Sequence, residues 1–256
     1  MSEYGPWLCG TQIADVYDAW CESVAGLDTA GAVDFLADLA GSGPVLELAV
    51  GTGRLALPLA KRSLEVHGID VSAEMLAKLR AKPGGDRLDL AQGDMADIDI
   101  DTRFRLVFVA FNTFFVLPSQ EEQVRCLKNI ARHLEADGTF LIEAFVPDLR
   151  RFAVDGPTST QRIELADVTL VDLATHHRAE QRVESTHIVL RSGGIDVVPV
   201  SIRYAYPGEI DAMAAVAGLR LRERWSSWRR EPFADDSTQH ISVYELDRQL
   251  TSAAGS

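Results

Sequence analysis

Apolar residues in the first 150 positions form short runs, separated by longer stretches with apolar residues at helical spacing. A short apolar run is typical of a buried strand, and a longer amphipathic stretch is typical of a helix packed on a sheet. Their alternation predicts a mostly parallel sheet covered by helices. The expected strands are 45–49, 64–69, 87–92, 105–110 and 139–145, and the expected helices are 54–62, 73–81 and 120–135.

The segments on either side of this core follow different patterns. Residues 11–40 carry apolar residues at helical spacing and predict two helical stretches. After Pro147 the chain becomes rich in β-forming residues over 161–171, 177–191 and 195–205. We expect these residues to form an antiparallel sheet inserted into the core.

Turn residues mark the elements near the end of the chain. Ser192–Gly194 is a hairpin signal between the last two inserted strands. Pro207 begins a further helix and Gly218 ends it. Two strands at about 219–226 and 240–246 then complete the main sheet. The expected division is a helical lid at 1–43, a core at 44–150, an inserted sheet at 151–205, a C-terminal completion of the core at 206–247 and a tail at 248–256.

Two of the expected helices begin with a capping residue. Ser72 precedes the helix that carries Met75, where its side chain can accept a backbone N–H. Ser119 followed three residues later by Glu122 is a capping-box pattern. We therefore expect helix starts directly after Ser72 and Ser119.

Composition narrows the class of protein. With 256 residues and 46% apolar content, the chain can bury one full core with elaborations. It has no apolar run of about eighteen residues and no basic segment leading into an apolar one, so we expect a soluble, cytoplasmic protein. Cys9, Cys21 and Cys126 lack the spacing of metal ligands or of a disulfide framework, and no metal site is expected.

The net charge restricts the classes of partner that the protein can bind. The formal charge of −13 disfavours a phosphate backbone or an anionic membrane, so we expect neither nucleic acid nor membrane as a partner. A small-molecule partner fits this charge, and a homodimer is compatible with the sequence.

A glycine turn follows the first expected core strand. Gly51-Thr52-Gly53 stands between that strand and a helix, and two glycines let a nucleotide-like ligand approach the backbone. The stretch 51–56 also fits the dinucleotide fingerprint G-x-G-x-x-A, so an NAD(P)-dependent oxidoreductase is one interpretation. A tight turn with no ligand is another.

Three acidic residues favour a different ligand. Glu47 lies before the turn, where it would repel a pyrophosphate and attract a cation. Asp70 ends the second strand, where its carboxylate can accept hydrogen bonds from ribose hydroxyls. Asp94 follows the third strand and can accept from an adenine amino group, with Met95 packed on the ring. The three indicate a cationic adenosyl ligand.

This ordered set resembles the class I S-adenosylmethionine-dependent methyltransferases. The resemblance implies a Rossmann-like α/β fold, a seven-stranded mostly parallel sheet with an N-terminal helical lid and an inserted antiparallel sheet. It also implies that S-adenosyl-L-methionine binds and S-adenosyl-L-homocysteine is released. The residues that it assigns to the donor site are Tyr17, Glu47, Ala49, Gly51, Gly53, Asp70, Val71, Met75, Asp94, Met95, Ala110 and Phe111.

The acceptor side resembles small-molecule enzymes of this family, including natural-product and amino-sugar N-methyltransferases. Tyr17 lies in a stretch similar to their N-terminal lid helix, where a core tyrosine is the alternative. Phe115 and Phe114 wall the pocket or simply pack a strand end. The candidate acceptor-binding residues are Tyr17, Asn112, Phe115, Glu143, Trp225 and Trp228.

The expected reaction is attack by an acceptor nitrogen, oxygen or carbon on the donor's methyl carbon. The protein contributes alignment and exclusion of water, and a neutral amine needs no base. For a hydroxyl acceptor, the candidate bases are Glu143 and His177, with His176, His187 and His240 as further histidines. A protein that binds the donor without transferring methyl is an alternative.

Overall fold

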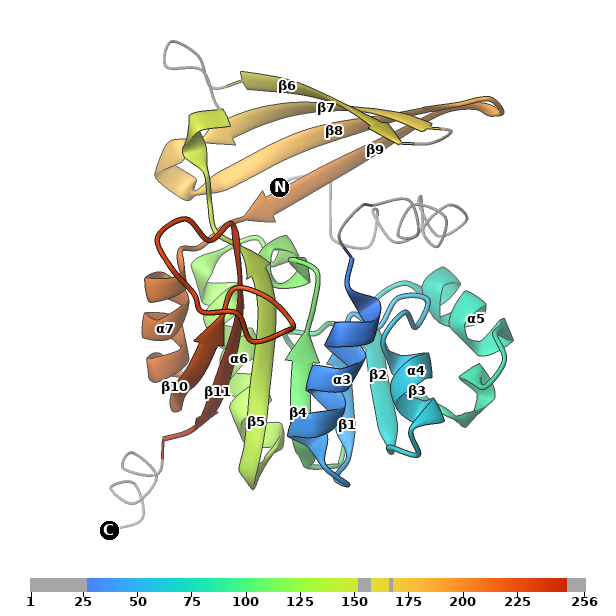
Figure 1. Ribbon diagram of the computed structural model, residues 1–256, viewed down its shortest axis with the longest axis vertical. Coiled ribbons are helices and arrows are strands. Elements are labelled where there is room, and N and C mark those ends of the chain that lie inside the picture. The colour runs from blue at the N-terminus through green and yellow to red at the C-terminus, as the bar shows by residue number, and fades with distance from the viewer. Residues whose placement is uncertain (1–26, 152–157, 166–167, 248–256) are drawn as a thin grey trace.

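The structure of the protein is a computed structural model, which describes residues 27–151, 158–165 and 168–247 (Figure 1). Tyr17, the first part of the expected lid and the tail at 248–256 lie outside the described residues. Among those described, no helix is long and apolar enough to cross a membrane.

The main sheet has seven strands in the order β10-β11-β5-β4-β1-β2-β3. β11 runs antiparallel to both of its neighbours, and the other pairs are parallel. The expected α/β fold class is therefore confirmed. The strands are β1 Val45–Leu48, β2 Val66–Asp70, β3 Asp89–Gln92, β4 Phe104–Val109, β5 Leu134–Phe145, β10 Leu219–Trp225 and β11 Gln239–Leu246.

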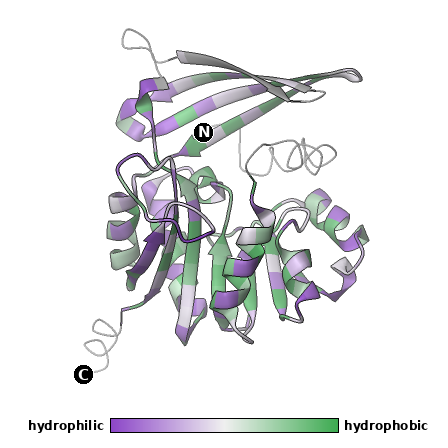
Figure 2. Ribbon diagram, in the orientation of Figure 1, coloured by the Kyte–Doolittle hydropathy of each residue, from purple (hydrophilic) through white to green (hydrophobic). Residues whose placement is uncertain are grey.

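Helices cover both faces of this sheet (Figure 1). Phe35, Leu59 and Leu79 come from the helices on one face and share a buried apolar cluster with Phe108 of β4. Leu127 and Met213 come from the helices on the other face and belong to a second buried apolar cluster. Figure 2 shows the apolar colour concentrated on the central strands. The α-helices are α3 Thr29–Ala40, α4 Ala56–Lys61, α5 Ala73–Ala81, α6 Gln120–His133 and α7 Pro207–Val216, and the 3-10 helices are η1 Gly85–Arg87, η2 Thr113–Val116, η3 Leu149–Arg151 and η4 Arg178–Glu180.

Both predicted capping residues begin their helices. The Met75 N–H donates to Ser72 Oγ at 3.2 Å, and the Glu122 N–H donates to Ser119 Oγ at 3.2 Å. These side chains satisfy amide groups that have no partner within the helix. The predicted starts of α5 and α6 are confirmed.

The expected boundary between α6 and the next strand was wrong. α6 ends at His133 rather than at 135, and β5 begins at Leu134 rather than at 139. The register with β4 shifts between the Phe104–Leu134 and Leu106–Thr139 pairs, so the extra residues form an irregularity in the strand. Gly138 is required there, because a Cβ atom would lie 2.7 Å from the Phe104 carbonyl oxygen.

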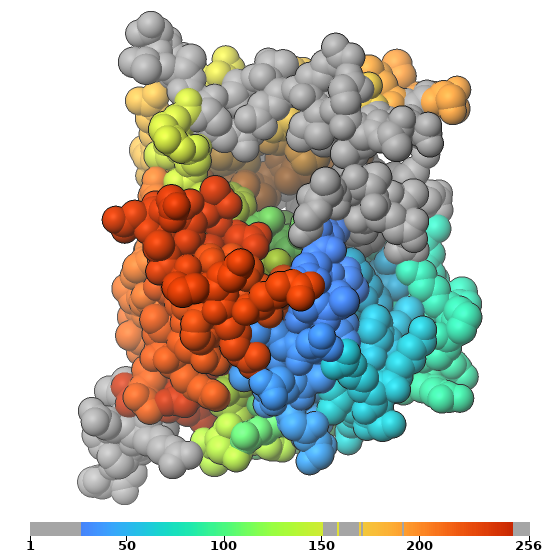
Figure 3. Space-filling view, viewed as in Figure 1, coloured from blue at the N-terminus to red at the C-terminus, as the bar shows by residue number. Residues whose placement is uncertain are grey.

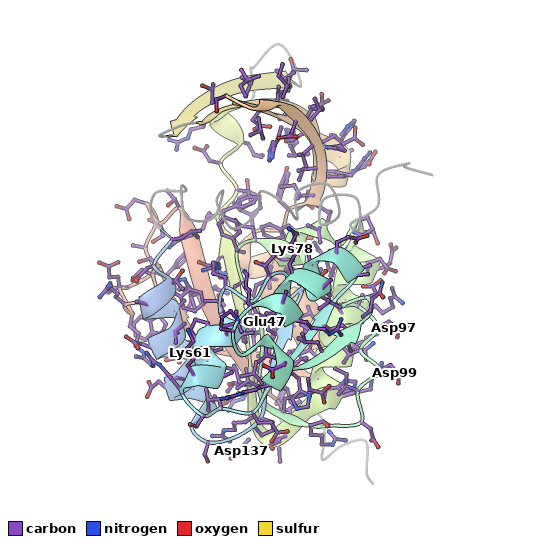
Figure 4. All side chains as sticks on the ribbon, turned by 90° about the vertical axis from the view of Figure 1, so that its right-hand side faces the viewer. Glu47, Lys61, Lys78, Asp97, Asp99 and Asp137 are labelled. Atoms are coloured by element: carbon purple, nitrogen blue, oxygen red, sulfur yellow. The ribbon has the colours of Figure 1, made fainter. Side chains whose placement is uncertain are left out.

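The inserted segment forms a second, antiparallel sheet of four strands. These strands are β6 Thr158–Leu165, β7 Val168–His177, β8 Arg182–Arg191 and β9 Gly194–Arg203, in sequence order. The sequence predicted only three β-rich segments there, and it left His176 between two of them instead of in β7. The hairpin at Ser192–Gly193 is confirmed, since Arg191 pairs with Gly194. This second sheet arches over the carboxyl ends of the core strands (Figures 1 and 4).

Candidate active site

The carboxyl ends of the core strands meet below the second sheet, and the glycine turn lies at this edge. The backbone has positive φ at Ala49 (53°), Gly51 (56°) and Gly53 (84°). At Gly53 a Cβ atom would also lie 2.2 Å from Leu79 Cδ1, so a side chain there would force the Leu79 side chain of α5 to move. The turn thus keeps its backbone open toward the edge, as expected for a nucleotide-like ligand.

Glu47 lies in β1 with its side chain buried; only 6% of the residue is exposed. Figure 4 shows it inside the core, whereas Lys61, Asp97 and Asp99 lie at the outside. Its carboxylate accepts the Ala56 N–H, but Oε2 is buried with no hydrogen-bond partner within the described part of the chain. Burial raises the pKa of Glu47 to about 8, against the opposing charge of Arg54. A cationic ligand group would supply the missing partner.

Asp70 ties the turn to the end of β2. Its Oδ2 accepts the Gly51 N–H at 2.8 Å, and its Oδ1 accepts the Ser72 N–H at 2.8 Å. Burial raises the pKa of Asp70, and these backbone donors oppose that rise. Each carboxylate oxygen has a second lone pair, so the group can still accept hydroxyl donors. Asp70 therefore both shapes the turn and remains a candidate ligand for ribose.

The end of β3 places its acid differently. Asp94 Oδ1 accepts the Ala96 N–H at 2.8 Å, Oδ2 lies 3.7 Å from Arg125 Nη2, and the side chain is 54% exposed. Met95 is buried in the apolar core. Of the other predicted donor residues, Val71 is half-buried at the end of β2 and Met75 is buried in α5.

A tight turn ends β4 next to the predicted acceptor residues. Phe111 and Asn112 both have positive φ, 55° and 65°, after the buried Ala110. The Phe111 N–H donates to Glu143 Oε2 at 2.7 Å, and Asn112 Oδ1 accepts the Phe145 N–H at 2.7 Å. These bonds fasten the turn to the end of β5.

Glu143 and Trp228, both predicted acceptor residues, are hydrogen-bonded to each other. Trp228 Nε1 donates to Glu143 Oε1 at 2.9 Å, so both carboxylate oxygens of Glu143 accept protein donors. Trp228 is buried and its ring packs edge-on against Phe35 at 5.8 Å. The position of Glu143 at a strand's carboxyl end suggested a base, but buried N–H groups require partners, and Glu143 provides two of them.

The segment 226–238 lies over the carboxyl end of the main sheet on the face shown in Figure 3. Arg229 Nε lies 2.9 Å from Asp28 Oδ2, and Arg230 pairs with Asp38 and covers the Phe35 ring at 4.4 Å. These contacts fasten the segment to α3. They explain why Trp228 is covered rather than open to an acceptor.

The histidines named as candidate bases occupy different surroundings. His177 lies on the same face of β7 as the exposed Leu173, 3.2 Å from Glu184. His176 is buried on the opposite, inner face, where its Nε2 lies 2.8 Å from the Tyr204 hydroxyl, and burial lowers its pKa. His240 is fully buried beside Ser242, and burial lowers its pKa to about 4.

The inner face of the second sheet also carries an acid and a further histidine. Asp172 of β7 stands directly opposite His187 of β8, with Oδ1 and Nε2 3.5 Å apart. Asp172 is buried, whereas the His187 side chain is 29% exposed. Both are on the face that holds the buried Ala174, which packs into the core cluster. This pair therefore faces the core.

Arg54 is a site residue that sequence reasoning missed. Its charge acts on both Glu47 and Glu143, its Nη1 donates to Thr29 Oγ1 at 3.3 Å, and its guanidinium lies 5.7 Å from the Phe111 ring centre. Its position directly after Gly53 was the feature of the sequence that could have identified it. Trp225, by contrast, is half-buried in β10 and pairs with Ile241, in the row that contains Glu143.

The chain is similar to known methyltransferases over most of its length. A methyltransferase domain is matched over residues 45–138. The structure of the CcbJ methyltransferase from Streptomyces caelestis is 41% identical with a TM-score of 0.88, covering 95% of this chain and 99% of that one. The cypemycin N-terminal methyltransferase of Streptomyces sp is 29% identical over 202 residues, which is 78% of this chain and 82% of that protein. The dTDP-3-amino-3,4,6-trideoxy-alpha-D-glucopyranose N,N-dimethyltransferase of Streptomyces venezuelae is 30% identical over 135 residues, covering 51% and 56%.

Proposed function

We propose that this chain, which belongs to the S-adenosylmethionine-dependent methyltransferases, acts on a small molecule and that its acceptor atom is an amine nitrogen of a natural product. The names of two relatives support a nitrogen atom as the methyl acceptor. They are the cypemycin N-terminal methyltransferase and the amino-sugar N,N-dimethyltransferase. A neutral amine presents a lone pair to the methyl carbon without a base in the transfer step.

The residues at the edge of the main sheet fit the donor. When bound, S-adenosylmethionine supplies an electrophilic methyl group on a sulfonium. Glu47 would bind the cationic methionine end, because its buried Oε2 has no partner among the described residues. Asp70 would accept the ribose hydroxyls with its remaining lone pairs. The buried oxygen of Glu47 carries this proposal, since a buried polar atom requires a hydrogen-bonding partner.

The second sheet would position the acceptor above the donor edge. Asp172 and His187 face the core from its inner surface. A carboxylate attracts a protonated amine, and a neutral histidine can then accept its proton before the amine attacks. In this proposal the donor sits on the core, and the amine binds between the core and the second sheet.

Glu143 and His177 have no base role in this proposal. Glu143 accepts donors from Phe111 and Trp228 with its two oxygens, and His177 lies on the outer face of β7. Glu143 instead holds the turn after β4, and His177 pairs with Glu184 across β7 and β8. Asn112 stays a candidate wall residue, because its turn opens at the same edge.

Calorimetry and product analysis test the proposal. We expect S-adenosylhomocysteine to bind the wild-type protein and methylated product to form from amines, but not from the matching alcohols, in a panel of small molecules. The variant Glu47→Gln should bind the donor more weakly, while Glu121→Gln, on the exposed start of α6, should bind as the wild type does. If the folded protein does not bind S-adenosylhomocysteine, the proposed donor site is wrong. Methylation of alcohols alone would exclude the amine.

A further inference from the structure

We propose that Arg203 is a positioning residue for the acceptor, because it holds the second sheet at a set orientation over the donor site. The inference rests on the proposed function, in which the acceptor binds between this sheet and the core. It concerns a residue distant from the glycine turn and outside the candidate donor and acceptor residues.

The second sheet joins the core at one end. β6 follows η3, and β9 leads through residues 204–206 into α7. The hairpin between β8 and β9 extends far from α7 (Figure 1), and Ile195 and Val197 beside it are 67% and 57% exposed. A small rotation at the joined end therefore becomes a larger displacement along the sheet.

Arg203 is the last residue of β9 and is only 6% exposed. Its Nη1 donates to Gln123 Oε1 of α6 at 2.7 Å, and its Nη2 pairs with Glu209 of α7. The Gln123 Nε2 donates back to the Arg203 carbonyl oxygen at 2.8 Å. Both the side chain and the backbone of Arg203 are thus held by core helices.

The same cluster includes the turn between β7 and β8. Arg203 Nη2 donates to Gln181 Oε1 at 3.3 Å, and Gln181 Nε2 donates to Glu209 Oε2 at 2.7 Å. Gln120 Nε2 of α6 donates to Glu209 Oε1 at 2.9 Å. A planar guanidinium with several fixed partners sets an orientation that a point charge does not. The cluster therefore fixes two strand ends of the second sheet on α6 and α7.

The cluster continues to the surface that faces the acceptor. Tyr204 follows Arg203, is buried, and shares a hydrogen bond with His176 on the inner face. β9 also packs on η2, directly after Asn112. Displacing Arg203 would move the inner face, with Asp172 and His187, relative to the end of β4. A misplacement of about 1 Å can reduce a rate by about 100-fold.

Kinetics with Arg203→Met tests the positioning role. We expect kcat/KM for the acceptor to fall about tenfold or more, while the Kd for S-adenosylhomocysteine stays within about twofold. The matched control is Arg224→Met, which breaks a half-buried pair with Asp211 between β10 and α7 and leaves the second sheet untouched. It should lower stability without a selective acceptor defect. An equal loss of donor and acceptor binding in Arg203→Met would overturn the proposal.

Two further variants keep the test open if Arg203→Met folds poorly. Gln123→Leu retains the Arg203–Glu209 pair and should show a smaller acceptor defect of the same kind. Arg203→Ala should regain acceptor turnover in millimolar guanidinium chloride but not in ammonium chloride, since only guanidinium reproduces the planar donors. Unchanged acceptor kinetics in all three variants would exclude Arg203.

Spin labels measure the orientation of the sheet without any activity. With Cys9 and Cys21 replaced by serine, labels at Ile195→Cys and Lys61→Cys report the distance between the second sheet and α4. We expect Arg203→Met to broaden that distance distribution, and an unchanged distribution would overturn the proposal. If the wild type methylates no amine, the proposed function fails, while this distance still decides whether Arg203 holds the sheet.

Discussion

At the residue scale, the carboxyl group of Glu47 is the most consequential buried group of the site. Burial raises its pKa to about 8, so it is mostly protonated at pH 7 in the free protein. A cationic ligand favours the ionised form, so in the proposed donor site donor binding and loss of this proton are coupled. This coupling has consequences for binding and for stability.

Donor affinity should rise with pH below 8. If only ionised Glu47 binds the donor, its affinity increases about tenfold between pH 6 and 7, because the ionised fraction does. Calorimetry of S-adenosylhomocysteine in buffers of different ionisation enthalpy should detect the released proton. Glu47→Gln should lose about 1.5–3 kcal/mol of binding free energy and most of the pH dependence. A wild-type affinity independent of pH would contradict the coupling.

Stability should change with pH in the opposite direction. The folded protein retains a proton on Glu47 that the unfolded chain loses above about pH 4.5, so the free energy of unfolding falls as pH rises from there through 8. The slope is at most about 1.4 kcal/mol per pH unit. In urea unfolding at a series of pH values, Glu47→Gln should show a shallower fall than the wild type and than Glu121→Gln. Equal slopes would mean that Glu47 titrates normally.

Asp70 combines two roles, and its replacement should reveal both. Asp70→Ala removes the acceptor of the Gly51 and Ser72 N–H groups along with the candidate ribose ligand. We expect a lower Tm and a donor Kd weakened by about 1.5–3 kcal/mol. Asp101→Ala, in an exposed loop, is the control. Undiminished donor affinity would remove Asp70 from the donor site.

At the element scale, features set by local chemistry were predicted and features set by packing were not. Ser72 and Ser119 begin their helices because a capping bond involves only neighbouring residues. The early start of β5 depends on its pairing with Phe104 of β4, a partner distant in sequence. The same holds for Glu143, whose role follows from donors on β4 and on the segment 226–238. The sequence located the carboxyl ends of the core strands, but it could not predict which side chains form hydrogen bonds with one another there.

The turn after β4 should depend on Glu143 for its shape. In Glu143→Gln, an amide N–H₂ would face one of the two donors, so we expect a loss of about 1–3 kcal/mol in the free energy of unfolding. The pH profile of kcat should keep its wild-type form, because the group holds structure and moves no proton. Thermal unfolding and kinetics of the same preparation decide the matter. A catalytic base would instead give a large fall in kcat at unchanged Tm.

At the scale of the whole molecule, the alternation of elements predicted the mostly parallel sheet covered by helices, and the family resemblance implied its seven strands. The β-rich composition after Pro147 predicted the inserted sheet, but the order of the strands was not predicted. The number of inserted strands was not predicted either, since both faces of this sheet carry mixed residues and its turns are weakly marked. Arg54 was missed for a related reason. Arg54 matters because its positive charge acts on the carboxylates of Glu47 and Glu143. These two residues lie on different strands, and only the fold brings them near Arg54.

The net charge of −13 should assist a cationic acceptor. A negative potential raises the encounter rate of cations, and salt screens it over a Debye length of about 10 Å at 0.1 M. We expect kcat/KM for an amine acceptor to decrease as sodium chloride increases from low concentration. An uncharged analogue should respond much less. Equal salt dependence of the two would exclude this long-range attraction.

The insertion of the second sheet also bears on how such enzymes diversify. Residues 158–203 leave and rejoin the core near α7, while the pairing of all seven core strands is made without them. Recombination at the two connections could therefore exchange this module as a unit and retain the methyl-donor machinery. A chimera that keeps Gln120, Gln123 and Glu209 as its mounting surface would be the natural design for a transferase of altered acceptor range.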